Sequence, residues 1–474
     1  MWILIFILIN CPVWSQEVLD IKQDRQLFLD GYIIHQLSGL ELELHQPIDQ
    51  GPIMYFDKPW EGPFSAYCTV IKDSTRYRMY YRGLPTAGSD GSDREVTCYA
   101  ESTDGLHWIK PTLDLFEVPG SGENNVILAH ASPVTHNFSP FLDRNPLREN
   151  SEKFKALGGT RKSGLIAYCS ADGIHWQRIQ DSAVFSDGIF DSQNVSFWSD
   201  SENTYVCYFR TWTEDGYSGF RSVGRTTSKD FIQWSTPQSM IFGDTPFEHL
   251  YTQQTSPYFR APQIYVAVGA RFMPNRQVLT KDQAALINVN PKYYQDCSDA
   301  YIMTTRGGAH YDRTFMESFI RPGIGLENWV SRSNYPALNI VPLDETQMGI
   351  YVNADYAQPT AHIKLYTLRT DGFSSLSGSY EIGEMITKPF IFFGSQLEIN
   401  FATSAAGFIK FELQDLEGHA LTGFQLKEAT EVIGNEIKRI VQWSSGKELS
   451  DLSGKPVRMR IQMKDADLYS FRFF

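Results

Sequence analysis

The heptapeptide Ser102-Thr103-Asp104-Gly105-Leu106-His107-Trp108 decides the fold, because it recurs along the chain. It returns as Ser170-Ala171-Asp172-Gly173-Ile174-His175-Trp176, and weaker copies begin at Ser228, Thr305 and Thr370. The copies start roughly 60 to 75 residues apart, about the length of a four-stranded propeller blade with long loops. The repeat therefore predicts a five-bladed β-propeller.

The repeat itself has the composition of a tight turn. Glycine accepts a positive φ, and the aspartate side chain can bond the backbone two residues further on. We expect Asp104, Asp172 and Asp230 to be structural turn residues, and the tryptophan of each copy to pack on the next strand.

Short strand-like runs precede each turn. In the first copy they span 67–72 and 76–82, and in the third copy 194–198 and 204–210. No stretch before residue 380 keeps a helical period over three turns, which predicts an all-β array. We expect the early run 26–34 to add the last strand of the fifth blade, so that the ring has no free edge.

Beyond Gly383 the sequence changes to longer alternating runs. Apolar and polar residues alternate in 396–403, 407–414, 437–443 and 457–463, which predicts a β-sandwich. Glycan binding and support of the propeller are the two roles considered for this domain, and support is favoured because its alternation shows no aromatic platform. The predicted organisation is a signal peptide at 1–16, a propeller catalytic domain at 17–382 and a sandwich at 383–474.

The first sixteen residues are free of charged side chains and open with the apolar run 2–9. This run is too short to span a bilayer and is followed by Pro12 and Ser15, as in a secretory signal cleaved near Ser15 or Gln16. Lipidation of Cys11 is the alternative. No later segment approaches membrane-spanning length, so we expect a secreted or periplasmic protein.

Charge and cysteine content exclude several classes of protein. The chain has 42 Lys and Arg against 55 Asp and Glu, a net charge of -13, which speaks against sequence-independent nucleic-acid binding. With 42% hydrophobic residues it can bury a large core. The cysteines form no CxxC motif and no Cys/His cluster, so neither a disulfide framework nor a zinc site is indicated. Free buried thiols are expected at Cys68, Cys98, Cys169, Cys207 and Cys297.

Candidate catalytic acids stand where the inner propeller strands begin, at one mouth of the channel. Glu61 and Asp191 precede inner strands of non-adjacent blades. Glycosidic cleavage needs two such carboxylates, one protonated to release the leaving oxygen and one ionised as base or nucleophile. Salt bridges between blades are the alternative role. Glu317 is a third candidate, unless it pairs with Arg321.

Candidate substrate contacts occupy the same mouth. Arg82, Arg210 and Arg271 stand near the ends of second strands, where guanidinium groups would bind a uronate or sulfate unless they staple blades together. The further candidates, for stacking on sugars, hydroxyl contacts or an anionic substituent, are Trp60, Tyr251, His136, Asn137, Gln193, Asn194 and Arg260. The chemistry needs no metal or organic cofactor. A structural cation in the channel, held by carboxylates and carbonyls, stays open.

Several stretches resemble the secreted glycosyl hydrolase-like proteins of Planctomycetes, Verrucomicrobia and Bacteroidetes, over almost the whole mature chain. They are 59–62, 136–146, 190–194, 260–262, 371–373, 400–407 and 464–470. That group is similar in architecture to the furanosidases of glycoside hydrolase families 32 and 43.

The resemblance implies three acids at the channel mouth, at Glu61, around His136-Asn137 and at Asp191. The second position carries no acid here. Gln263 and Gly307 stand where the group has His and Asp.

The predicted function is a secreted glycoside hydrolase that cleaves a poly- or oligosaccharide, including an anionic one, with Asp191 and Glu61 as the acid/base or nucleophile pair. The alternative is a non-catalytic carbohydrate-binding or surface-scaffold protein. Carboxylates in an open pocket would favour hydrolysis, and pairing of each acid with an arginine would favour the scaffold. A lyase on the same fold would show a Tyr/His pair, of which Tyr251 and His249 are the hint in the sequence, and a phosphorylase would show an Arg/His phosphate nest.

Overall fold

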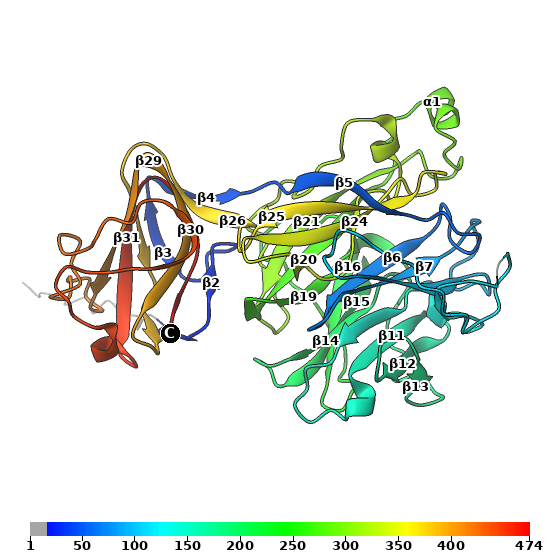
Figure 1. Cartoon of the computed structure of the whole chain (residues 1–474), viewed down its shortest axis with the longest axis horizontal. Coiled ribbons are helices and arrows are strands. Elements are labelled where there is room, and N and C mark those ends of the chain that lie inside the picture. Colours follow the sequence, from blue (N-terminus) through cyan, green and yellow to red (C-terminus); the bar gives the residue numbers. More distant parts are fainter. Residues whose placement is uncertain (1–16, 121) are drawn as a thin grey trace, which may run out of the picture. The chain divides into compact units, whose positions relative to one another are not determined.

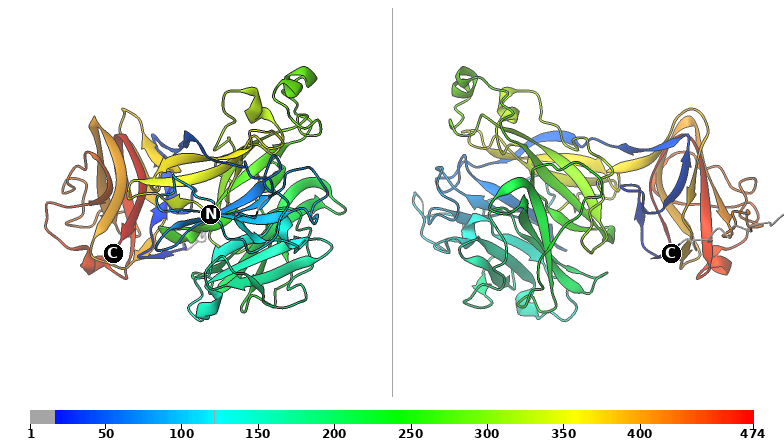
Figure 2. Two further views of the ribbon diagram at one scale, coloured as in Figure 1. Left: turned by 45° about the vertical axis from the view of Figure 1, so that its right-hand side comes forward. Right: turned by 180° about the vertical axis from the view of Figure 1, so that it is seen from behind.

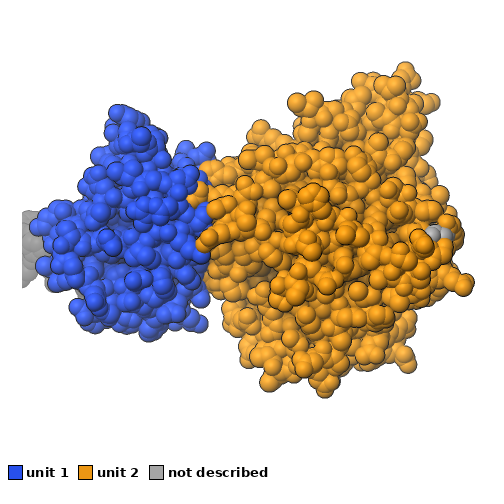
Figure 3. Space-filling model, in the orientation of Figure 1, with its two compact units in different colours: residues 1–43, 375–474 blue, residues 44–374 orange. Residues whose placement is uncertain are grey.

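A computed structural model of the chain describes residues 17–120 and 122–474. The predicted signal at 1–16, with Cys11, lies outside the described residues. The described residues form two compact units, residues 44–374 and the segments 17–43 and 375–474 together (Figure 3). The larger unit is a five-bladed β-propeller, as the repeat predicts (Figure 1).

The first three blades are four-stranded antiparallel sheets. Blade 1 consists of β6 (Ala66–Lys72), β7 (Tyr77–Gly83), β8 (Val96–Ser102) and β9 (Val126–Leu128). Blade 2 consists of β10 (Ser139–Leu142), β11 (Phe154–Thr160), β12 (Gly164–Ser170) and β13 (Gln177–Arg178). Blade 3 consists of β14 (Val195–Ser199), β15 (Thr204–Glu214), β16 (Ser218–Ser228) and β17 (Gln238–Ser239).

In blades 4 and 5 the inner strand is split into two pieces that pair with one second strand. Blade 4 consists of β18 (Leu250–Thr252), β19 (Thr255–Tyr258), β20 (Ala261–Met273) and β21 (Cys297–Thr305). Blade 5 consists of β22 (Tyr335–Pro336), β23 (Val341–Pro342), β24 (Gln347–Ala354), β25 (His362–Arg369) and β5 (Ile48–Tyr55).

The short helices are insertions between strands. The α-helix of the described residues, α1 (Lys281–Leu286), follows β20 and starts at a capping box between Thr280 and Gln283. No helix within 17–120 or 122–474 is long and apolar enough to cross a membrane. The 3-10 turns are η1 (Val134–His136), η2 (Asn150–Glu152), η3 (Leu326–Trp329) and η4 (Leu449–Leu452).

The repeated heptapeptide forms the predicted turns, and these turns join neighbouring blades. Asp104 Oδ1 accepts the backbone N–H groups of Leu106 and His107, each at 2.8 Å. The N–H of His107 and its ring, bonded to the carboxylate, lower the pKa of Asp104. The turn of blade 1 packs on blade 5, because the Tyr351 hydroxyl donates to Gly105 O at 2.8 Å. The predicted structural role of Asp104, Asp172 and Asp230 is confirmed.

Blade 2 repeats this joint on blade 1. Gly173 has a φ of +78°, and a Cβ atom there would lie 2.5 Å from the Tyr80 hydroxyl. The indole of Trp176 contacts the Tyr80 ring edge to face at 6.2 Å. Glycine is therefore needed at this position for two reasons, the left-handed backbone and the tyrosine of the preceding blade.

The ring is closed by an N-terminal strand, but by another one than predicted. Strand β5 pairs with β25, with Met54 opposite Ile363 and Tyr55 opposite His362. The predicted run 26–34 instead contributes to the smaller unit, where β2 (Gln26–Leu27) pairs with β31 (Pro456–Phe473). An alternating run indicates a strand but does not identify its partner, which explains the difference.

The smaller unit is built from both ends of the chain, so its extent differs from the predicted 383–474 (Figure 2). Its strands are linked into one ten-stranded sheet around a common hydrophobic core. They are β1 (Leu19–Lys22), β2, β3 (Ile34–Ser38), β4 (Leu40–Leu44), β26 (Ser374–Gly378), β27 (Gly383–Thr387), β28 (Phe390–Phe392), β29 (Leu397–Gln414), β30 (Asn435–Ile440) and β31.

The two longest strands of this unit, β29 and β31, turn a corner together. Along β31 the buried side chains alternate up to Met463 and resume at Ala466, so the buried face changes phase at Lys464 and Asp465. The register with β29 is interrupted at the same place, between Thr403 and Phe408. Such irregular corners let one pair of strands contribute to both layers of a sandwich.

The five described cysteines are free and buried, as predicted. Burial raises the pKa of the Cys207 thiol to about 12. These thiols therefore act as small apolar side chains.

Ring closure by β5 predicts unequal effects of two substitutions on this strand. Met54 is buried in the core of blades 1 and 5, so Met54→Ala should lower the free energy of unfolding by about 2 to 5 kcal/mol. Ile48 on the same strand is exposed, and Ile48→Ala should change it by less than about 0.5 kcal/mol. Denaturant unfolding of the propeller measures both. Equal effects would show that β5 does not close the ring against this core.

Candidate functional site

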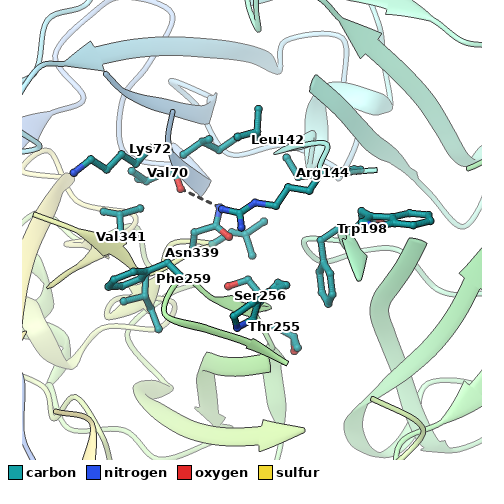
Figure 4. Close-up of a pocket in the computed structure, with 18 of the residues that line it drawn as sticks. Val70, Lys72, Leu142, Arg144, Trp198, Thr255, Ser256, Phe259, Asn339 and Val341 are labelled. Atoms are coloured by element: carbon teal, nitrogen blue, oxygen red, sulfur yellow. Dashed lines mark hydrogen bonds between the residues drawn. The ribbon is translucent and has the colours of Figure 1, made fainter. Parts of the chain in front are cut away.

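Each end of the inner strands encloses a cavity. The start cavity, about 30 Å³, is lined where inner strands begin, by Tyr67 of β6, Tyr251 of β18, Tyr335 of β22 and by His136 before β10. The end cavity, about 120 Å³, lies where the inner strands end (Figure 4). The sequence places its candidates at the first of these two ends.

Amide side chains cross the channel between the two cavities. Gln193 Nε2 donates to Thr69 Oγ1 at 2.8 Å, and Gln193 Oε1 accepts from Gln254 Nε2 at 2.7 Å. Gln254 also donates to Pro336 O at 2.9 Å. Gln193, predicted to bind sugar, therefore links blades 1, 3, 4 and 5 across the channel.

The two asparagines predicted as substrate contacts, Asn137 and Asn194, donate hydrogen bonds to backbone carbonyl groups. Asn137 Nδ2 donates to three carbonyl groups, those of Gly159, Phe190 and Ser192, at 2.6 to 2.9 Å. Asn194 Nδ2 bonds the carbonyls of Phe190 and Ser192. Both side chains are fully buried and neither lines the start cavity. They shape the loop before β14.

Glu61 is fully buried in an ion pair. Its Oε2 accepts from Lys110 Nζ at 2.6 Å and its Oε1 accepts from the Tyr81 hydroxyl at 2.5 Å. It is not among the residues that line the start cavity. The structure thus gives Glu61 a structural role, in an ion pair within blade 1 and not in the salt bridge between blades that was the alternative.

Three further predicted contacts have structural partners away from the start cavity. Trp60 is buried in the core and donates its Nε1–H to Asn125 at 2.9 Å. Arg260 pairs with Asp371 at 2.8 Å, at the other end of blade 4. Arg271 pairs with Asp299 at 2.6 Å and with Glu248 at 2.7 Å. None of them lines the start cavity.

Asp191 stays at the mouth, paired with Arg210. Arg210 Nη1 donates to Asp191 Oδ1 at 3.1 Å, and the second guanidinium nitrogen donates to Tyr251 O. The Asp191 side chain is 28% exposed, so it is reachable from solvent. Arg210 thereby staples blade 3 to blade 4.

Glu317 is exposed on the segment between blades 4 and 5 and lines neither cavity. Within the described residues it forms no ion pair with Arg321. Neither of the two roles considered for Glu317 is therefore supported by the structure.

His136 and Arg82 do line the start cavity, together with Glu95, which the sequence analysis did not single out. His136 Nδ1 lies 3.0 Å from Glu95 Oε1, 3.2 Å from Arg82 Nη1 and 3.3 Å from the backbone N of Gly91. Arg82 and Gly91 present donors to this nitrogen, and Glu95 is the nearest group and an acceptor whose carboxylate has no other hydrogen bond among the described residues, so we assign the proton to Nδ1. His136 Nε2 is buried and has no hydrogen-bond partner among the described residues. Asp90 Oδ1 is 4.0 Å from it.

Arg332 supplies a second guanidinium to this cavity. Within the described part of the chain it makes no hydrogen bond and no ion pair. Its contacts are with the rings of Tyr293 at 5.2 Å, Tyr251 at 5.5 Å and Tyr356 at 5.8 Å. Its φ of +61° is unusual for arginine and fixes the side chain's direction.

Tyrosines form most of the remaining wall. Tyr67, Tyr251, Tyr293, Tyr335 and Tyr356 all line the start cavity. The Tyr335 hydroxyl is buried without a hydrogen-bond partner among the described residues, and burial raises its pKa. Tyr335 begins the inner strand of blade 5, so applying the strand-start rule to that blade would have found it. No pattern in the sequence points to Arg332 or Glu95.

The end cavity is larger but mainly apolar, with Val70, Leu142, Phe259 and Val341 in its wall. Figure 4 shows Arg144 extending over it, and the Asn339 amide bonds Val70 O at 3.0 Å. The start cavity, although smaller, has the unpartnered buried polar atoms of His136 and Tyr335. Such atoms are rare in folded proteins and indicate a polar ligand or water.

A groove of about 490 Å³ lies between blades 2 and 3 near the start cavity. Trp212 and Tyr217 of the β15–β16 hairpin line it, together with the carboxylates Asp187, Glu214 and Asp215. Arg221 connects the two places, because its guanidinium lies 4.7 Å from the Trp212 ring and 5.3 Å from the Tyr251 ring. Burial and the nearby Arg210 lower the pKa of Arg221.

The described residues contain no group of three or more His, Cys, Asp or Glu side chains placed to hold a metal ion. The cation considered for the channel has no such cluster at either cavity among residues 17–120 and 122–474.

No family model matches the chain, and no curated protein matches it. Solved structures are similar to it at low sequence identity. An N-acetylgalactosamine deacetylase from F. plautii, in complex with blood group B trisaccharide, is 13% identical, with 70% of this chain and 96% of that chain covered and a TM-score of 0.46.

Two hydrolases are also similar in structure. A fructofuranosidase from Schwanniomyces occidentalis is 12% identical, with 90% of this chain and 98% of that chain covered and a TM-score of 0.40. A glycosyl hydrolase from Bacteroides ovatus is 14% identical, with 75% and 95% covered and a TM-score of 0.35.

The burial of Glu61 predicts that this residue supports the fold. Glu61→Gln should lower the free energy of unfolding by about 3 to 5 kcal/mol, because it leaves the charge of Lys110 with poorer compensation. Asp57 bonds the same lysine from an exposed position, and Asp57→Asn should cost less than about 1 kcal/mol. Chemical denaturation compares the two. A fully stable Glu61→Gln protein would contradict the structural role.

Proposed function

We propose that the start cavity binds the acidic group of a saccharide, a uronate carboxylate or a sulfate ester. The observation that carries this proposal is Arg332, whose guanidinium lines the cavity without an ion pair or hydrogen bond to any described residue. A guanidinium presents several N–H donors in one plane, which matches the paired oxygens of a carboxylate or sulfate.

Charge around the cavity supports an anionic ligand. Glu95 lies 4.0 Å from Arg82, and Asp191 pairs with Arg210. Arg332 and Arg221 have no carboxylate partner among the described residues. The wall of the cavity carries Arg82 and Arg332 against Asp90 and Glu95, so the attraction for an anion comes from the unpaired Arg332 and not from an excess of arginine.

The size of the cavity supports entry of one acidic group and not of a whole sugar ring. At about 10 to 15 Å³ for each water-sized group, its 30 Å³ holds about two. The ring would lie above, against tyrosine faces such as Tyr67 and Tyr293, which are only partly buried. The neighbouring groove, with Trp212 and Tyr217, offers space and aromatic surface for further sugars of a chain.

The resemblance to secreted glycosyl hydrolase-like proteins agrees with a saccharide ligand. The apolar run 2–9 and the residues after it support export, and we place the protein outside the inner membrane on that ground. The groove beside the cavity makes an oligo- or polysaccharide the expected ligand.

This function predicts selective loss of binding in Arg332→Gln. Its affinity for a uronate polymer such as polygalacturonate should fall roughly ten- to a hundredfold, the value of a hydrogen bond to a charged group. Arg144→Gln removes an exposed, unpartnered arginine at the end cavity and should bind like wild type. Calorimetry with polygalacturonate, alginate, a sulfated glycan and a carboxyl-reduced polymer gives the affinities.

The carboxyl-reduced polymer is the matched control for charge, because it keeps the backbone and lacks the acid. Equal affinity for this polymer and its parent would contradict the proposal. An equal loss in Arg332→Gln and Arg144→Gln would do the same.

Hydrolysis is the second candidate, and Asp191 is the observation that favours it. Its carboxylate is partly exposed at the mouth beside Arg210. Hydrolysis predicts release of reducing ends that Asp191→Asn reduces at least a hundredfold without loss of folding, because one catalytic carboxylate is removed. Reducing-end assays with the wild type and Asp230→Asn, a turn variant, as references measure this. Unchanged release in Asp191→Asn would exclude this carboxylate as catalytic.

A further inference from the structure

Glu95 and His136 form a buried dyad that points into the start cavity. The two side chains are 2% exposed, and Glu95 Oε1 accepts from His136 Nδ1 at 3.0 Å. A carboxylate that holds one ring nitrogen protonated leaves the other, Nε2, as a base toward the ligand. His136 Nε2 has no hydrogen-bond partner among the described residues, so its lone pair is free for a proton.

Tyr67 stands next to this dyad. Its ring packs edge to face on His136 with 5.5 Å between centroids, and Arg82 lies 4.9 Å over the same ring. Among the described residues, its hydroxyl has one hydrogen-bond partner, the carbonyl of Asp191 at 3.3 Å. Burial and the neighbouring Tyr251 raise the pKa of Tyr67, so this hydroxyl keeps its proton at neutral pH.

We propose that the start cavity cleaves a uronate-bearing polysaccharide by β-elimination, with His136 as the general base and Tyr67 as the general acid. This inference rests on the proposed function, because the uronate carboxylate must occupy the cavity beside Arg332.

The depth of the dyad favours elimination. The proton removed in this reaction is on C5, the carbon that carries the carboxylate. A base for C5–H must therefore lie next to the bound acid group, inside the cavity, which is where His136 lies. Asp191 belongs to the mouth but is not among the residues that line the cavity, so it is less well placed for C5.

The charges around the cavity fit the electronic demand of the reaction. Loss of the C5 proton places negative charge on the carboxylate, and preformed positive groups stabilise such charge most when they are fixed and desolvated. Arg82 is buried and held by Phe64 O at 2.9 Å. Arg332 is held among three tyrosine rings.

The step balances without a further reactant. His136 Nε2 takes the C5 proton, and the C5–H electron pair forms the C4=C5 double bond. The C4–O4 bond breaks, and O4 leaves with its electron pair and takes the proton of the Tyr67 hydroxyl. The proton on His136 returns to Tyr67 through solvent. The products are a chain with an unsaturated terminal uronate and a chain with a free hydroxyl at the former O4.

The experiment uses the ultraviolet absorbance of the conjugated C4=C5 bond. The full-length mature protein is incubated with polygalacturonate, alginate and chondroitin sulfate, and absorbance is recorded together with reducing ends. We expect absorbance to rise in step with reducing ends for at least one polymer. His136→Gln and Tyr67→Phe should each lower the rate roughly a hundredfold or more. His107→Gln, an exposed turn histidine, should leave it unchanged.

Glu95 is a positioning residue in this scheme, because it acts through His136. Glu95→Gln should lower kcat at nearly constant KM, whereas Arg332→Gln should chiefly raise KM. A merely structural role of Glu95 would lower the active fraction and the melting temperature together. If His136→Gln does not fold, Tyr67→Phe alone decides, since it removes one oxygen and keeps the packing.

The outcomes separate this inference from the proposed function. Reducing ends without absorbance would overturn elimination and support hydrolysis. Tight, carboxyl-dependent binding without cleavage of any polymer would overturn elimination and leave the proposed function intact. Absence of carboxyl-dependent binding would overturn both. An absorbance rise unaffected by Tyr67→Phe and His136→Gln would reject the assigned residues.

Discussion

The propeller depends on a joint between each turn and the blade before it. In blades 1 and 2 the turn glycine leaves room for a tyrosine hydroxyl of the preceding blade, and the turn tryptophan packs on the same tyrosine. In these two blades a Cβ atom on the glycine would meet that hydroxyl, whereas the turn of blade 3 has Phe231 at the same position, packed on Phe141 of blade 2 at 5.5 Å. Because the joint sits at one end of the blades, the other end is free to carry polar side chains at the channel mouth.

Some charged residues of the mouth hold neighbouring segments together through hydrogen bonds and ion pairs, and others are unpaired. Arg82 and Arg210 bond carbonyl groups that belong to neighbouring segments, and Glu61 neutralises Lys110 inside blade 1. Burying such charges is tolerable only because each has a partner. The groups without such a partner among the described residues include Arg332 and the outer nitrogen of His136, which line the same small cavity. We therefore place the functional site at the polar groups that have no bonding partner within the fold.

A small polar cavity beside an open groove with Trp212 and Tyr217 in its wall suits a ligand with two parts. The cavity holds one charged group, and the groove, at about 490 Å³, is large enough for neighbouring units of a chain. Arg221 lies between Trp212 and Tyr251 and links the two places. The arrangement separates recognition of charge, which is deep, from recognition of sugar rings, which is near the surface.

The sequence by itself determined the repeat, and with it the number of blades, the turn role of Asp104, Asp172 and Asp230, and the mouth at which polar residues gather. It also located His136, Arg82 and Tyr251 at the cavity. These features follow from local chemistry, since an Asp-Gly turn and an alternating strand are visible along the chain. Only the tertiary structure decided that β5 closes the ring and that the Glu61 carboxylate is buried in an ion pair with Lys110. It alone brought Arg332 and Glu95 to the cavity. The physical reason is that a charged side chain's role is set by its partners, and those partners come from distant parts of the sequence, as Glu95 and His136 show.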